Sequence, residues 1–243
     1  MKSENKATAN ALLAALNDLT DEEMLALTDN PGKLKEFCGA LVIENTQNTF
    51  VIPLSDNEVQ EQYPQFTDRL ASWRELAVLL DYRGPITWKV KQGFTLKTHA
   101  PLAGSCHDKL NYLQGWNFVD DPTTDSLVFW IPRLAKESTR KTIKQMEAHR
   151  VELKKRHELP ESHATSFGSI QLLFALILAH FKRTGERVPL SCLYAASDTL
   201  NPDGNRLFAG DFGGDGLYCP DWNDSVGYGT VGFFLLGVEK LGQ

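Results

Sequence analysis

The longest apolar run in the chain, FGSIQLLFALILAHF at positions 167–181, constrains the fold more than any other segment. It is shorter than the roughly 20 residues that a helix needs to span a bilayer, and it contains Gln171 and His180. Because the run is apolar on all sides, it predicts a helix buried in the middle of a folded domain, with packing partners around its whole circumference. We predict that Ser166 caps this helix and that Gly185 ends it.

Shorter periodic segments flank this helix. Apolar side chains at steps of three and four residues predict helices, whereas β-branched and aromatic runs bounded by turn residues predict strands. The predicted helices cover residues 8–19, 20–27, 64–84, 105–113 and 134–158. The predicted strands cover 40–54 (as a hairpin), 86–90, 93–98 and 126–131. Without regular β-α alternation, the pattern indicates an α+β fold, with mixed helices and antiparallel hairpins around one central buried helix and a glycine-rich β-type C-terminal region.

The turn-rich segment ELPESHATS, residues 158–166, is a candidate boundary. It divides the chain into an N-terminal α+β region, 1–158, which ends in a charged helix, and a region 159–243 with the buried helix and the turn-rich β part. One continuous domain is the alternative, because a helix that is apolar on every side needs partners from elsewhere in the chain.

Charge and cysteine usage indicate the surroundings of the protein. A net charge of −6 argues against a dedicated nucleic-acid-binding protein, which would carry a basic excess. The four cysteines form no CxxC pair, and the N-terminal MKSENKATANALLAALNDL has no apolar stretch typical of a signal peptide. We therefore expect free thiols and a cytoplasmic protein without a membrane span. The cysteines are Cys38, Cys106, Cys192 and Cys219.

The stretch NPDGNRLFAGDFGGDGLYCPDWND, residues 201–224, holds five Asp, five Gly and two Pro. Its NPDG has the composition of a tight turn and predicts the tip of a β-hairpin, with GGDG and CPDWND as the next two turns. The DFG string within it is a chance match to the kinase motif, because the other kinase motifs are missing from the sequence.

Acidic oxygens and aromatic rings alternate in this region, as they do in sites for sugars and peptides. We predict a protein without catalysis of its own that binds a small molecule or a protein through the turn surface 198–228. The predicted contact residues are Asp203, Asp211, Asp215, Tyr218, Asp221 and Trp222. No cofactor is expected. Calcium is the alternative, held by Asp198, Asp203, Asp211 and Asp215, although the spacing fails the EF-hand template.

A second hypothesis is a cysteine-dependent hydrolase with Cys106 as nucleophile and His107 beside it. Cys106 would lie in the first turn of a predicted helix, where the helix dipole would lower the pKa of its thiol. The base would come from a histidine elsewhere in the chain, for which the candidates are His149, His157, His163 and His180.

A third hypothesis is a scaffold or oligomer-forming protein. The segment 136–158 contains eight Lys or Arg and four Glu, and its apolar residues form no broad stripe. It could contact an acidic partner or a second copy of the chain.

The segment GERVPLSCLYAAS, followed near the C-terminus by VGFFLL, resembles the C-type-lectin-like fold of the sulfatase-modifying and variable tail-protein families. The Trp-rich centre of these families is missing, and Phe234 stands where they carry an Arg.

Overall fold

The computed structural model of the chain describes Thr20 and residues 50–242. Apart from Thr20, the helices predicted over 8–19 and 20–27 lie outside these residues, as does the first part of the predicted hairpin over 40–54. Residues from Phe50 onward contribute to one compact unit, and only this unit is described below.

The first sheet contains four strands, β1 (Val51–Leu54), β2 (Thr87–Val90), β3 (Ser126–Trp130) and β9 (Leu236–Lys240). Their order is β1-β2-β3-β9, and every neighbouring pair is antiparallel. The predicted strands at 86–90 and 126–131 are thus confirmed. Because β9 pairs with β3, the last strand of the chain completes a sheet that begins before position 158.

Strand β3 is buried on both faces, which explains why its sequence SLVFW is apolar without alternation. Val128 and Trp130 pack into the core around α8, while Leu127 and Phe129 pack into a second core on the opposite face of the sheet. The sheet therefore lies between two layers of helices.

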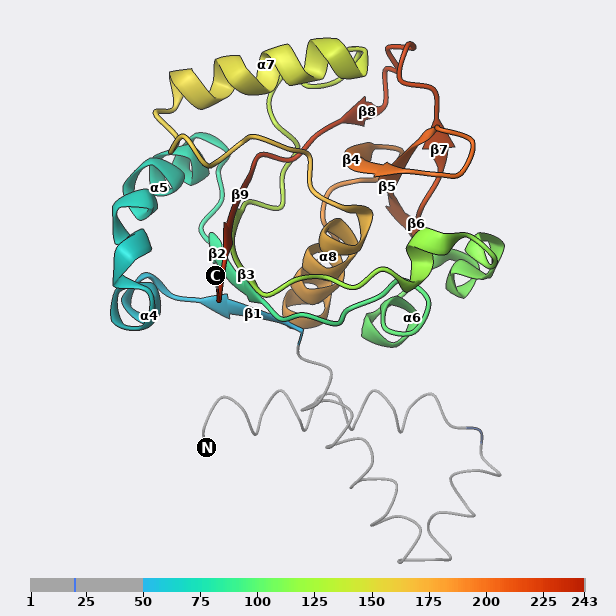
Figure 1. The fold of residues 1–243 in the computed structure, drawn as a ribbon, viewed down its shortest axis with the longest axis horizontal. Helices are drawn as coiled ribbons and strands as arrows, with labels where there is room; N and C mark the ends of the chain where they lie inside the picture. Colours follow the sequence, from blue (N-terminus) through green and yellow to red (C-terminus); the bar gives the residue numbers. More distant parts are fainter. Residues whose placement is uncertain (1–19, 21–49, 243) are drawn as a thin grey trace, which may run out of the picture. The chain divides into compact units, whose positions relative to one another are not determined.

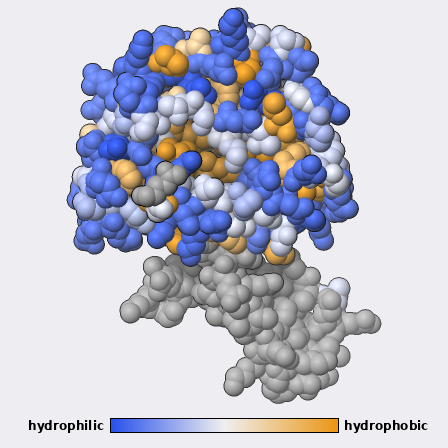
Figure 2. Space-filling view, viewed as in Figure 1, coloured by the Kyte–Doolittle hydropathy of each residue, from blue (hydrophilic) through white to orange (hydrophobic). Residues whose placement is uncertain are grey.

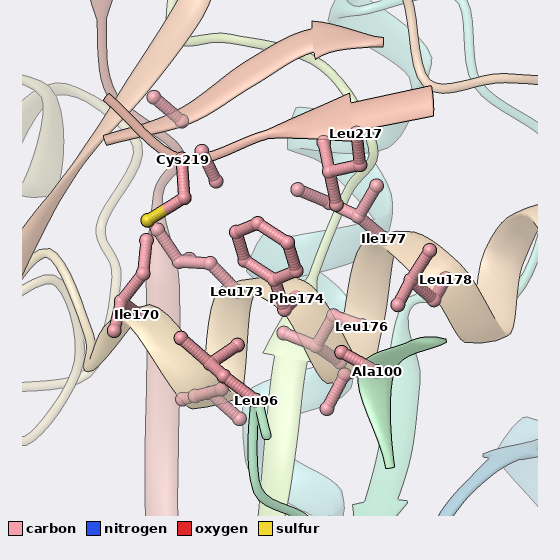
Figure 3. Close-up of a cluster of buried hydrophobic side chains, with 14 of the residues drawn as sticks. Leu96, Ala100, Ile170, Leu173, Phe174, Leu176, Ile177, Leu178, Leu217 and Cys219 are labelled. Atoms are coloured by element: carbon pink, nitrogen blue, oxygen red, sulfur yellow. The ribbon is translucent and has the colours of Figure 1, made fainter. Parts of the chain in front are cut away.

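Helix α8 (Ile170–Thr184) forms the layer on the first face and lies in the centre of the ribbon (Figure 1). It packs against α6 (Ala100–Ala103) and against strands of both sheets. Ten of its 15 residues are buried, and its side chains labelled in Figure 3 project into an apolar cluster. Gly185 ends the helix in a left-handed conformation, as predicted, but the cap is Ser169 and not Ser166. The helix begins about one turn after the start of its apolar run, so Ser169 takes the capping position. Its hydroxyl accepts a hydrogen bond from the Leu172 amide.

The second sheet is built from the C-terminal region and contains β4 (Tyr194–Leu200), β5 (Arg206–Gly213), β6 (Gly216–Tyr218), β7 (Asp221–Trp222) and β8 (Val231–Gly232). Its order is β6-β5-β4-β8, with β7 also pairing with β5. All pairs are antiparallel except β4 with β8.

The turns of this sheet follow the sequence closely. NPDG forms the tip between β4 and β5, and GGDG joins β5 to β6, so both predictions are confirmed. The CPDWND prediction is wrong in part, because Asp221 and Trp222 form β7 on the edge of β5. Trp222 pairs with Arg206 and Asp221 pairs with Leu207, so both residues belong to the sheet, although the segment CPDWND has the composition of a turn.

Helices also cover the second face of the first sheet: α4 (Asp56–Gln62), a 3-10 turn (Pro64–Arg69), α5 (Leu70–Leu79) and α7 (Ile143–Arg156). Trp73 and Met146 are among the residues that they contribute to the second core. The helix predicted over 64–84 is divided between the 3-10 turn and α5 and ends at Leu79. The helix predicted over 134–158 is right only for Ile143–Arg156, because residues 134–142 form turns and irregular structure before the Thr142 cap.

The segment between β2 and β3 differs from its prediction. GFTLKT, residues 93–98, is not a strand; it forms turns in which Phe94 bonds to Thr123 through backbone and side chain. Its alternation reflects the burial of Phe94 and Leu96 in the core around α8. The helix predicted over 105–113 is also wrong, because Asp108, Lys109 and Leu110 have positive φ inside a short 3-10 segment.

The architecture is α+β, as predicted, with helices on both faces of an antiparallel sheet and a second sheet at one side (Figure 1). Hydrophilic residues dominate most of the face visible in Figure 2. Within residues 20 and 50–242, no helix has the length and apolar character needed to cross a membrane.

Candidate ligand-binding site

The second sheet and the 3-10 segment at His107–Leu113 border a small open pocket of about 230 Å³, which we call the acid-aromatic pocket. It contains three of the six predicted contact residues and two side chains that the sequence did not place there. Its lining is His107, Tyr194, Asp211, Gly213, Gly214, Asp215, Gly216 and Tyr218.

A close approach of two backbones builds one wall of this pocket. Cys106 forms an isolated parallel bridge with Leu217, and the Leu217 amide donates to the Ser105 carbonyl at 2.9 Å. At Gly216 a Cβ atom would lie 2.7 Å from the Cys106 carbonyl carbon, and the φ of +97° also favours glycine. The glycine thus permits the contact that brings His107 beside β6.

Asp211 is fixed by the backbone that crosses it. Its Oδ1 accepts a hydrogen bond from the Cys192 amide at 3.0 Å, and its own amide donates to the Leu193 carbonyl at 2.8 Å. Burial raises the pKa of Tyr194, and the neighbouring Asp211 carboxylate raises it further through its charge and a hydrogen bond. The carboxylate is therefore held in place next to a neutral phenol.

Asp215 lies on the exposed GGDG turn, where the described residues give its carboxylate no hydrogen bond or ion pair. Beside it, the rings of His107 and Tyr218 meet edge to face with centroids 5.1 Å apart. Tyr112 packs against both, and its hydroxyl accepts from the Cys219 amide. Asp215 is thus exposed and unpaired among the described residues, whereas ring contacts and one hydrogen bond support the aromatic wall.

The other three predicted contact residues lie outside the pocket. Asp203 is exposed at the tip of the β4–β5 hairpin. Asp221 accepts hydrogen bonds from the side-chain amides of Asn201 and Asn205, so it braces that tip. Trp222 packs against the ring of Tyr194 at 4.6 Å, and its further ring neighbours are Phe208 and Tyr228. It therefore supports the pocket from behind.

The structure does not bring the calcium candidates together. In the part of the chain that is described, no three His, Cys, Asp or Glu side chains lie close enough to hold a metal ion. Asp198 caps backbone instead: its carboxylate accepts from the amides of Phe167 and Gly168. The four acids are close in sequence, but they lie on different parts of the second sheet. Asp198 is in β4, Asp203 at the β4–β5 tip, Asp211 in β5 and Asp215 in the β5–β6 turn.

The environment of Cys106 is opposite to the one predicted for a nucleophile. Burial raises the pKa of its thiol to about 12, because a thiolate there would be removed from water. Its Sγ donates to the Ala100 carbonyl at 3.5 Å, and no regular helix begins at this position. Of the candidate bases, His149 bonds to the Lys136 carbonyl and His163 to Trp73. The expected lowering of the thiol pKa is therefore wrong.

Two of the basic side chains of α7 make contacts within the protein. Arg150 is buried, with its guanidinium carbon 4.5 Å from the ring centroid of Phe167. Lys154 makes an ion pair with Glu161. Since these cations have local roles, contacts with another chain would have to use the remaining basic residues of the helix.

Two pocket residues went unrecognised as contacts in the sequence. Tyr194 is opposite Gly210 in the β4–β5 register, one residue from Asp211, so the hairpin prediction could have placed it there. His107 comes from a segment more than a hundred residues away and reaches the pocket only through the Cys106–Leu217 bridge. No local pattern encodes that contact.

No family model, curated protein or solved structure matches this chain.

Proposed function

We propose that this protein is a non-catalytic binding protein whose acid-aromatic pocket receives a small cationic group, such as the ammonium or guanidinium of a basic side chain. The observation that carries the proposal is that the carboxylates of Asp211 and Asp215 line one cavity with the rings of Tyr194 and Tyr218. Carboxylates bind cations by charge-assisted hydrogen bonds, and the faces of aromatic rings attract them further.

The volume of the pocket fits a single functional group better than a whole drug-sized molecule. The pocket of about 230 Å³ is smaller than the roughly 300–1,000 Å³ typical of sites for such molecules. No Lys or Arg lines it among the described residues, so its two acids face no built-in counter-ion. A cation of the ligand would supply this counter-ion. Asp211 is already held by its hydrogen bond to the Cys192 amide, and Asp215 would reorient on its exposed turn to reach the cation.

Three probes test this function: N-acetyl-lysine methylamide, N-acetyl-arginine methylamide and the uncharged N-acetyl-norleucine methylamide. We expect the two cationic probes to shift the amide resonances of Gly213–Tyr218 in the full chain, and the norleucine probe to leave them unchanged. Asp215→Asn should weaken binding about tenfold, which is the loss of one charge-assisted hydrogen bond.

Asp203→Asn is the matched control, because it removes the same charge from an exposed position outside the pocket. It should bind like the unchanged protein. Equal binding of the norleucine probe, or equal weakening by both variants, would show that the pocket does not select a cation.

A further inference from the structure

A second cavity, of about 400 Å³, lies at the C-terminal end of α8 and is lined by four arginines. We call it the arginine cavity. Three separate segments build it: the loop after α5, the residues after β3, and the last turn of α8 with the residues that follow. Its lining is Asp81, Tyr82, Arg83, Gly84, Arg133, His180, Arg183, Thr184, Glu186, Arg187 and Pro189.

Among the described residues, the four guanidinium groups have no carboxylate partner. Within residues 20 and 50–242, none of them lies within 4.0 Å of an Asp or Glu oxygen, although Asp81 and Glu186 share the same cavity. Arg133 instead contacts the Tyr82 ring and donates to the Pro132 carbonyl, and Arg187 lies against Phe181 and Phe212. Four cations against two acids leave an excess of positive charge.

The end of α8 explains only part of this cluster. A basic residue in the last turn of a helix interacts favourably with the helix dipole, which accounts for Arg183. Arg83 and Arg133 come from other segments, and Arg187 follows the helix end. Arg83, Arg183 and Arg187 are exposed, so water screens their mutual repulsion and leaves their donors accessible to an anion.

A buried polar side chain without a partner lies in the same cavity. His180 is 5% exposed, and its Nδ1 makes no hydrogen bond to any described residue. The rings of Trp88 and Trp130 meet it edge to face at centroid distances of 6.5 and 6.3 Å, and their Nε1 atoms likewise make no hydrogen bond to a described residue. The closed side of the imidazole thus faces the core, while the residue as a whole lines the cavity between the arginines.

We propose that the arginine cavity binds the phosphate group of a phosphate-bearing molecule. Planar guanidinium donors match the oxygens of phosphate, and the excess of two positive charges balances a phosphate dianion better than a single carboxylate. His180 forms part of the wall of the cavity, and the volume leaves room for an organic part beside Tyr82. This site is separate from the acid-aromatic pocket and does not depend on it.

Isothermal titration calorimetry of the full chain with inorganic phosphate and with pyrophosphate, at low ionic strength, tests the proposal directly. We expect binding by the unchanged protein and a loss of at least about tenfold in the double variant Arg83→Gln/Arg183→Gln. Both residues are exposed and make no ion pair with a described residue, so the variant should keep its unfolding temperature. The imidazole resonance of His180 should shift and saturate together with the heat.

The matched control is Arg140→Gln/Lys144→Gln, which removes the same charge from exposed positions outside the cavity. It should retain binding within about twofold, a difference of less than 0.5 kcal/mol by the usual conversion. Equal weakening in the two double variants, or no binding of either anion together with no binding to the vesicles described next, would overturn the proposal.

Vesicles distinguish the source of the phosphate. Phosphatidylcholine vesicles with and without phosphatidic acid, which carries a phosphate monoester headgroup, are sedimented with the protein. Cosedimentation that needs phosphatidic acid, Arg83 and Arg183 would assign the site to a lipid headgroup. Calorimetric binding of the free anions without cosedimentation would assign it to a soluble phosphate ester.

Discussion

His163 shows how one buried side chain can make the stability of this protein depend on pH. Its imidazole is 0% exposed; its Nδ1 accepts from the Trp73 indole at 2.9 Å, and its Nε2 donates to Glu239 at 3.0 Å. A proton on Nδ1 would oppose the indole N–H, and burial lowers the pKa of His163 from about 6.5 to about 4, although the charge of Glu239 raises it. The folded state therefore keeps the ring neutral.

This pKa shift predicts a loss of stability in acid. Below about pH 6.5 the unfolded chain binds a proton at His163 that the folded chain refuses until about pH 4, so stability falls as the pH decreases through that window. The contribution amounts to about 3 kcal/mol at its full extent. Urea unfolding at several pH values should show it, and His163→Gln, which cannot be protonated, should show a shallower dependence. The same pH dependence in the variant would contradict the role of His163.

At the scale of elements, glycine positions decide whether β6 can form its wall of the acid-aromatic pocket. Gly216→Ala should destabilise the protein by about 2 kcal/mol or more, since its Cβ would collide with the Cys106 backbone at a positive φ. Gly214→Ala is the matched control, because nothing lies within 4 Å of the added Cβ there. Its stability should stay within about 0.5 kcal/mol of the unchanged protein. Thermal unfolding of the two variants measures the difference, and equal effects would show that the bridge is dispensable.

Elements with a local signal were predictable, and those set by distant contacts were not. The apolar run of α8, the NPDG hairpin tip and the run at β3 each encode their structure within a few residues. The failures at 93–98 and 105–113 lie in a segment whose conformation is set by bonds to Thr123 and by the bridge to β6. Apolar alternation there reports burial, and burial alone does not specify a strand.

The candidate sites followed the same rule. Asp211, Asp215 and Tyr218 lie close together in sequence on one hairpin and its neighbour, so composition could point to them. The arginine cavity joins three segments spread between residues 81 and 189, and the packing of the first sheet against α8 brings them together. No local pattern of residues encodes such a convergence.

At the scale of the whole molecule, α8 couples the two sheets through one core. Phe174 projects from α8 beside Cys219, and the cluster around it also takes in Leu217 of β6 and Trp130 of β3 (Figure 3). Phe174→Ala should therefore cost about 3–5 kcal/mol, the usual range for a buried phenylalanine. Because both sheets share that core, the loss should reach β3 and β5 alike.

Amide hydrogen exchange measures this coupling directly. In Phe174→Ala, the slowest-exchanging amides of β3 and β5 should lose protection by equal amounts, as expected when both open only in global unfolding. Val78→Ala is the control, since Val78 is 77% exposed and its loss should change stability by less than about 0.5 kcal/mol. If only the amides of one sheet lost protection, the two sheets would unfold independently, and α8 would belong to the sheet that responded. The acid-aromatic pocket and the arginine cavity would then sit on units able to open separately, whereas a shared loss would tie both sites to the single core around α8.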